Sequence, residues 1–163
     1  MVLLRGDWRE RYHDRPDLCS VGCAGEVVEV ETLEDGRYNI VLHGVREFQI
    51  RDEVGGESYR QAAVSWREAV IDPISDEQRR ALRTLVTRHL RAAGGGGGER
   101  PFIDDSVSDD LFVNLASVAT GLPAMEQQAL LESVGTGGRA ARLRELLDFA
   151  SHPSSPSGGG LLH

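Results

Sequence analysis

The hydrophobic period changes once along the chain, and this change limits the possible folds more than any other feature. From Gly22 to Val70 apolar and polar residues alternate, which is typical of strands with one buried face. After Asp72-Pro73-Ile74-Ser75 the apolar residues recur at spacings of three and four, which is typical of amphipathic helices. Strands followed by helices predict an α+β fold.

The alternating half predicts a β-meander. Val28 and Val30 point to one face of the first strand, while Glu29 and Glu31 point to the other. The pair Asp35-Gly36 predicts a hairpin turn after this strand, because glycine accepts the positive φ that such turns require. Three further strands are expected, over residues 37–43, 45–54 and 59–70.

The helical half begins at a capping signal. Ser75 is followed three residues later by Gln78, a spacing that predicts a capping box at the start of a helix. The five glycines from Gly94 to Gly98 end this helix, because each costs about 0.5–1 kcal/mol in a helix interior, and they predict a flexible linker. The apolar stripe of the helix comprises Leu82, Leu85, Val86, Leu90 and Ala93.

Three more helices are expected beyond the glycines. Ser108 and Thr136 are placed to cap the first and the last of them, and Pro123 opens the middle one. Their core-facing stripes are predicted to be Leu111, Leu115, Val118, Ala119 and Leu122, then Met125, Ala129 and Leu130, then Leu143, Leu146, Leu147 and Ala150. We therefore expect a β subdomain over 1–73, a helical subdomain over 74–150 and a disordered Ser/Pro/Gly-rich tail over 151–163.

The charged residues exclude several kinds of chemistry. All 18 basic residues are arginine, and against 26 acidic residues they leave a net charge of −8. Because lysine is absent, a Ser-Lys dyad, a Schiff-base lysine and a P-loop lysine are excluded. The negative charge, with arginines interspersed among acids, argues against nucleic-acid binding.

The apolar runs predict neither a membrane span nor a signal peptide. The longest run falls well short of the roughly 18 residues that a transmembrane helix needs. The N-terminus reaches Arg5 after three apolar residues, too early for the apolar stretch of a signal peptide. The two cysteines are too few for a disulfide framework. We expect a cytoplasmic protein without membrane contact.

The strand motifs resemble a known family. The pattern of short strands, the turn around Asp35-Gly36 and the glycine before the 45–54 strand together are similar to the N-terminal substrate-binding domain of Lon proteases. The likeness is greatest to bacterial proteins that carry this domain without the ATPase and peptidase parts. The segments that carry it are Val21–Gly25, Val27–Val30, Leu33–Ile40, Leu42–Arg46 and Phe48–Ile50. The resemblance implies a PUA-like β-barrel followed by a helical bundle.

Two departures from the family pattern stand out. The family has further strands upstream, and this chain begins where those strands finish. Either the start site has been set too late or the barrel lacks a wall; we favour the first, because an unpaired strand edge promotes aggregation. A truncated gene product without independent activity is the corresponding alternative. In addition, Glu47 and Gln49 stand where relatives often have arginine.

The resemblance implies a binding domain and not an enzyme. Lon peptidase activity resides in a serine and a lysine of a separate domain, and this chain contains neither lysine nor a GxxxxGK[ST] motif. The expected partners are polypeptides with exposed apolar segments, or a protease, and no cofactor is expected. Three aromatic residues in predicted loops, Trp8, Tyr12 and Phe102, are candidates for partner binding. Packing into the barrel mouth is their alternative role.

A thiol- or metal-dependent hydrolase is the alternative from another functional class. Cys19, Cys23 and His43, with His13 nearby in the sequence, are residue types that bind zinc or act as nucleophile and base. The CxxxC spacing and the irregular positions of the histidines argue against such a site. In the simpler interpretation, Cys23 is a small buried apolar residue and Cys19 lies in a loop.

Overall fold

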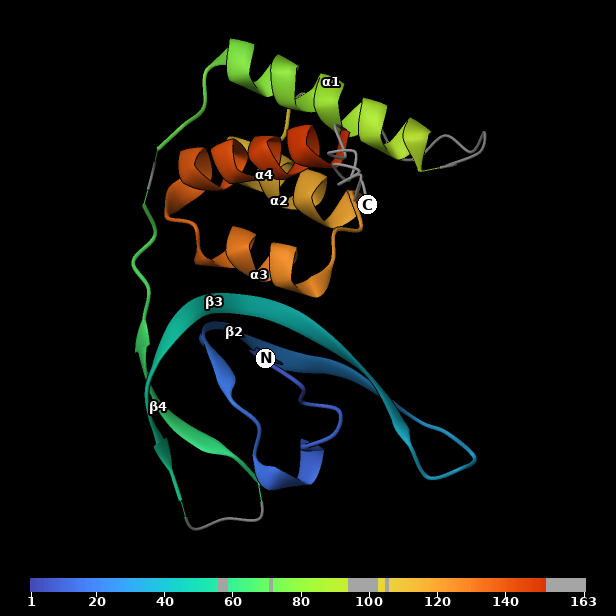
Figure 1. The fold of residues 1–163 in the computed structure, drawn as a ribbon, viewed down its shortest axis with the longest axis vertical. Helices are drawn as coiled ribbons and strands as arrows, with labels where there is room; N and C mark the ends of the chain where they lie inside the picture. The colour runs from blue at the N-terminus through green and yellow to red at the C-terminus, as the bar shows by residue number, and fades with distance from the viewer. Residues whose placement is uncertain (56–58, 71, 94–102, 105, 152–163) are drawn as a thin grey trace, which may run out of the picture. The chain divides into compact units, whose positions relative to one another are not determined.

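The chain forms two compact units, Met1–Ala69 and Val70–His163, in a computed structural model. The structure describes residues 1–55, 59–70, 72–93, 103, 104 and 106–151. In these residues the first unit contains a four-stranded sheet and the second contains four α-helices (Figure 1). The α+β class is thereby confirmed. The predicted linker at 94–98, Phe102 and the predicted tail beyond residue 151 lie outside the described residues.

The sheet of the first unit is an antiparallel meander in the order β1-β2-β3-β4. A short 3-10 helix, η1, lies between β1 and β2. The elements are β1 (Val2–Leu4), η1 (Tyr12–Asp14), β2 (Leu18–Thr32), β3 (Tyr38–Val54) and β4 (Gln61–Trp66). The strand β1 was not predicted, because three residues are too few to show an alternation.

One predicted strand boundary is wrong. The segments 37–43 and 45–54 were expected to be separate strands, but residues 38–54 form the continuous strand β3. Gly44 does not interrupt the ladder, since it pairs with Gly25 of β2 next to a register shift between Ala24 and Gly25. The hairpin formed by β2 and β3 is therefore much longer than the sequence indicated, with strands of 15 and 17 residues.

The turn of this hairpin follows the prediction. Gly36 adopts a φ of 82°, which an L side chain rarely accepts. The Asp35 carboxylate accepts a hydrogen bond from the Arg37 backbone at 3.1 Å and pairs with its guanidinium at 2.7 Å. These contacts close the loop between Thr32 and Tyr38.

The second unit begins with the predicted capping box. Ser75 Oγ accepts a hydrogen bond from the Gln78 backbone at 3.2 Å, and Gln78 Oε1 accepts one from the Ser75 backbone at 2.8 Å. Ser108 caps the next helix in the same way, accepting from the Leu111 backbone at 3.3 Å. The helices are α1 (Asp76–Ala92), α2 (Asp109–Ala119), α3 (Ala124–Glu132) and α4 (Gly135–Ser151).

The core of the second unit surrounds α4. This helix contacts α1, α2 and α3, and its residues Leu143 and Leu147 are completely buried. The cluster also contains Ile74, Leu82, Val86, Phe112, Val113, Ala116, Leu122, Leu130 and Ala140, with Leu85, Leu90 and Leu146 packed against it. The stripe predicted for α1 therefore faces the core, except that Ala93 lies exposed just after the helix end.

The face predicted for α2 is wrong. Leu111, Leu115 and Val118 are exposed, with Val118 at 77%, whereas Phe112, Val113 and Ala116 are buried. This helix is apolar on more than one side, so its period alone allows two rotations. The salt bridge from Asp109 to Arg79, at 2.7 Å, accompanies the observed rotation, and the Arg79 guanidinium lies 4.5 Å from the centre of the Phe112 ring.

The predicted helix ends also need correction. In α3, Met125 is exposed, although it was expected in the core. Thr136 does not cap α4, because the helix already begins at Gly135. Ser151 is the last residue of α4 and does not belong to the tail. Such shifts of one or two residues arise because ends depend on tertiary contacts as well as on caps.

The N-terminus of α4 is held by a carboxylate from a distant part of the chain. Asp72 Oδ2 accepts a hydrogen bond from the Gly137 backbone at 3.0 Å, 65 residues away. A negative charge here also complements the helix dipole. Ile74, two residues after Asp72, is held as well, because its backbone N–H donates a hydrogen bond to Asp109 Oδ2 of α2 at 3.2 Å. The segment that enters the helical unit is thus fastened to two of its helices.

Leu143 and Leu115 offer a direct test of the core. We expect Leu143→Ala to lower the free energy of unfolding by about 2–5 kcal/mol, because it leaves a cavity in a fully buried site. Leu115→Ala removes the same atoms from a site that is 43% exposed and should lower it by only about 1 kcal/mol. Urea unfolding measures both values. A loss for Leu115→Ala as large as that for Leu143→Ala would contradict the observed rotation of α2.

Two neighbouring glycines of α4 test the Asp72 contact. A Cβ at Gly137 would lie 2.7 Å from Asp72 Oδ2, whereas a Cβ at Gly138 would meet nothing within 4 Å. We therefore expect Gly137→Ala to destabilise the protein by about 1–3 kcal/mol and Gly138→Ala to stabilise it by about 0.5–1 kcal/mol. Thermal unfolding measures both. In an Asp72→Ala background, Gly137→Ala should lose its penalty, and a penalty that persists would refute the contact.

Candidate functional site

The far half of the β2–β3 hairpin has one apolar face. Directly opposed residues of an antiparallel pair lie on the same face of the sheet. The register pairs Val27 with Leu42, Val30 with Ile40 and Thr32 with Tyr38. These three pairs therefore share one side, which we call the apolar ribbon face and define as Val27, Val30, Thr32, Tyr38, Ile40 and Leu42.

The apolar ribbon face is open to solvent. Val27, Val30, Tyr38 and Ile40 are each exposed by 54–64%, and Val28, in the bulge between Val27 and Glu29, is exposed to a similar degree. Soluble proteins rarely leave a contiguous row of large apolar side chains exposed without a function. This row is therefore the strongest candidate for a binding surface among the described residues.

The opposite face of the ribbon is polar. Its pairs are Glu26 with His43, Glu29 with Val41 and Glu31 with Asn39. The Asn39 amide donates a hydrogen bond to the Glu31 carboxylate at 2.9 Å. Three carboxylates on this side make it the polar face of the ribbon. Both the polar face and the apolar face are open to solvent.

The sequence had indicated the alternation but not the exposure. Val30 was expected on a buried strand face, and that expectation is wrong. The available signal was strand length, because strands usually contain about 5–6 residues and a 15-residue strand must extend beyond a small sheet. The assumed break at Gly44 concealed this length.

Two of the three aromatic candidates lie together in the connection between β1 and β2. The ring centroids of Trp8 and Tyr12 are 6.4 Å apart. The His13 ring is oriented edge-on to the Tyr12 ring, with 5.5 Å between their centroids. The Arg9 guanidinium lies 5.2 Å from the centre of the Trp8 ring. Trp8 is half-buried and Tyr12 is exposed, so both packing and contact with a partner are open to this cluster.

Arg60 fastens this connection to the sheet. Its guanidinium donates to the Pro16 carbonyl at 2.6 Å and forms a two-point pair with the Glu53 carboxylate at 2.7 and 2.8 Å. The hydrogen bonds from Arg60 lower the pKa of Glu53 from its ordinary value, against a smaller opposing effect of desolvation. The pair thus joins the end of β3 to the segment that precedes β2.

The structure does not bring Cys19, Cys23 and His43 together in the part of the chain that it describes. Cys19 lies in β2 and is buried, which corrects the prediction that it is a loop residue, and Cys23 is only half-buried in the same strand. Four residues along a strand separate their Cα atoms by about 13 Å. His43 is exposed and pairs with Glu26, whereas Cys23 pairs with Glu47. Within the described residues, no group of three His, Cys, Asp or Glu side chains is placed to hold a metal ion.

A match to a protein-family model shows which known proteins this chain is related to. The model described as the ATP-dependent protease La (LON) substrate-binding domain matches residues 1–148, across both units. The chain belongs to this family. Membership in the Lon substrate-binding family supports a role in substrate recognition, and the part of Lon that matches is a binding domain.

In the described residues, none of the helices is both long and apolar enough to span a bilayer.

Individual relatives agree with this assignment. The chain is 26% identical over 137 residues to the Lon protease of Cytophaga hutchinsonii, covering 81% of this chain and 17% of that protein. It also resembles the crystal structure of a Lon N-terminal domain protein from Xanthomonas campestris, at 16% identity and a TM-score of 0.55 over 91% of this chain and 87% of that one. The N-terminal domain of a Mycobacterium avium complex Lon protease gives 19% identity and a TM-score of 0.59 over 93% and 89%. These structures share the fold of the family.

The Arg60–Glu53 pair predicts a pH dependence of stability. The folded-state pKa of Glu53 is lowered, so its ion pair adds stability above the unfolded pKa of about 4.3 and loses it as the pH falls through the lowered folded value. We expect Arg60→Gln to reduce the loss of unfolding free energy at acidic pH, because the ion pair is absent at every pH. The same change should speed amide hydrogen exchange in residues 5–17. Unfolding at several pH values and hydrogen exchange measure the two effects. Arg37→Gln is the control, and equal effects of both variants would contradict the role of Arg60.

Proposed function

We propose that this chain recognises polypeptides by binding exposed apolar segments on the apolar ribbon face. The observation that carries the proposal is the row of Val27, Val30, Tyr38 and Ile40, which are all more than half exposed on one side of the hairpin. The substrate-binding family to which the chain belongs supports it. We further propose that the role is non-catalytic.

The size of the face suits a short extended segment. From Tyr38 to Leu42 the strand rises about 14 Å, the length of roughly four residues of an extended partner. Burial of apolar surface contributes about 25 cal/mol per Å², without regard to the order of side chains in the partner. Such a surface would bind unfolded chains, which expose apolar residues, in preference to folded proteins, which bury them.

The acidic side of the ribbon limits association between copies. An exposed two-stranded ribbon with two apolar faces would aggregate, and charged residues on a strand are a common protection. Glu26, Glu29 and Glu31 supply that charge while the apolar face stays open. The cluster of Trp8 and Tyr12 is proposed as a second contact for the same partners.

Serine substitutions on the two faces of the ribbon, one of them a double variant, test the proposal. Val30→Ser and Val30→Ser/Ile40→Ser should weaken the binding of labelled apolar peptides, the double variant by at least about tenfold, because each change removes on the order of 1 kcal/mol of apolar burial. Val41→Ser is the matched control, since Val41 is half exposed on the opposite face. Fluorescence anisotropy gives the dissociation constants.

Salt and fold controls complete this experiment. Apolar binding should change little between low and high salt, because no charge is neutralised on the ribbon face. Circular dichroism should show that all variants keep the fold, as the changed side chains are exposed. Equal weakening by Val30→Ser and Val41→Ser, or no binding to a broad peptide array, would refute the proposed site.

A further inference from the structure

The charge of α1 is opposite to that of the whole protein. The chain carries a net charge of −8, yet from Gln78 to Gly98 it contains neither Asp nor Glu. The same stretch includes five arginines, at positions 79, 80, 83, 88 and 91. All five belong to α1, whose first turn also contains Asp76 and Glu77, so five arginines less two acids give this helix a net charge of +3 in an otherwise acidic molecule.

The arginines of α1 divide into two sets. Arg79 pairs with Asp109, and Arg83 donates to the Ile103 carbonyl at 2.9 Å; both also lie over the Phe112 ring. Arg80, Arg88 and Arg91 form the outer set, whose side chains are more exposed to solvent. Arg88 is about half exposed and its contact with Asp148 is long, at 3.6 Å, while Arg80 and Arg91 are exposed and form no ion pair with the described residues.

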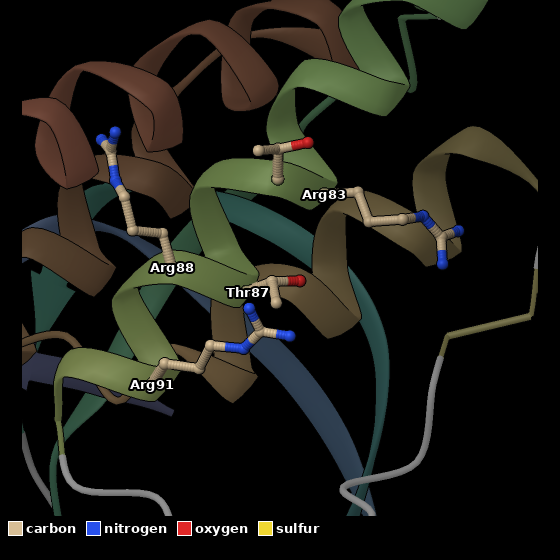
Figure 2. Close-up of a pocket in the computed structure, with 5 residues that line it drawn as sticks. Arg83, Thr87, Arg88 and Arg91 are labelled. Carbon is tan, nitrogen blue, oxygen red and sulfur yellow. The ribbon is translucent and has the colours of Figure 1, made fainter.

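The outer set lines one face of the helix. Positions 80, 84, 87, 88 and 91 follow the helical period on the side away from the buried Leu82 and Val86. A shallow groove of about 380 Å³ lies among Arg83, Thr84, Thr87, Arg88 and Arg91. Figure 2 shows Arg83 and Arg88 extending to opposite sides of α1, with Thr87 and Arg91 on the surface between them. We call Arg80, Thr84, Thr87, Arg88 and Arg91 the arginine face.

Helix stability accounts for only part of this arrangement. Asp76 and Glu77 lie four and three residues before Arg80, spacings at which opposite charges stabilise a helix, and the helix dipole favours Arg91 in the last turn. Like charges three residues apart, as in Arg80–Arg83 and Arg88–Arg91, oppose helix formation, and a face of mixed sign would avoid this. The excess of positive charge that remains on the arginine face therefore does not serve the stability of α1.

We propose that the arginine face binds an acidic segment of a partner polypeptide. Guanidinium groups form two-point hydrogen bonds with carboxylates, and the threonine hydroxyls can add further hydrogen bonds. A short acidic segment carries fewer and more widely spaced charges than a nucleic-acid backbone, so the molecule's net charge of −8 repels it less, which favours a polypeptide as the partner. This inference goes beyond the proposed function, because it concerns another surface with the opposite chemistry.

Binding to a short helical peptide with Glu at every fourth position tests this inference, with the Gln version of the peptide as reference. We expect the Glu peptide alone to bind, with about tenfold weaker affinity for R80Q/R88Q/R91Q and a similar weakening at high salt. The control R5Q/R11Q/R144Q makes the same change in net charge at three exposed arginines elsewhere and should leave the affinity within about twofold. Fluorescence anisotropy gives each affinity.

Two further measurements separate this inference from its competitors. The ribbon variant V30S/I40S should keep its affinity for the Glu peptide, so failure of one proposed surface leaves the other testable. A single-stranded oligonucleotide of the same charge should bind less tightly than the peptide. Tighter binding of the oligonucleotide, no binding of the Glu peptide, or equal loss in both triple variants would overturn the proposal.

Discussion

The helical unit is fastened where the chain enters it by one long-range contact, the hydrogen bond between the Asp72 carboxylate and the start of α4. This contact fastens the segment that enters the unit to the helix at its centre, 65 residues further along the chain. Leu143 and Leu147 of that helix are completely buried among α1, α2 and α3. The space beside Gly137 is what lets the carboxylate approach the helix so closely.

The two units use their apolar residues differently. The described core cluster belongs entirely to the helical unit, whereas the β unit exposes its largest row of apolar side chains on the β2–β3 hairpin. The binding surface that we propose for unfolded chains must stay open, so it cannot also serve as a core. The Asp35–Arg37 turn and the β ladder hold the ribbon together in place of burial.

Local signals in the sequence predicted several elements correctly, because the interactions behind them are local. The capping box of Ser75 and Gln78 joins residues three apart, and the turn at Gly36 depends on the φ of one residue. The strand motifs were specific enough to indicate the Lon substrate-binding family, which the family model confirms. The rotation of α2 was not predictable, because Leu115 and Val113 suit a core equally well.

The sequence by itself determined the change from strands to helices, the family and the absence of lysine chemistry, since each depends on residue type and spacing alone. Only the tertiary structure decided which apolar faces are covered. Val30 and Phe112 both lie in apolar patterns, but one is exposed on a ribbon that extends beyond the sheet and the other is enclosed by helices. Burial depends on neighbours distant in the chain, and no local pattern specifies them.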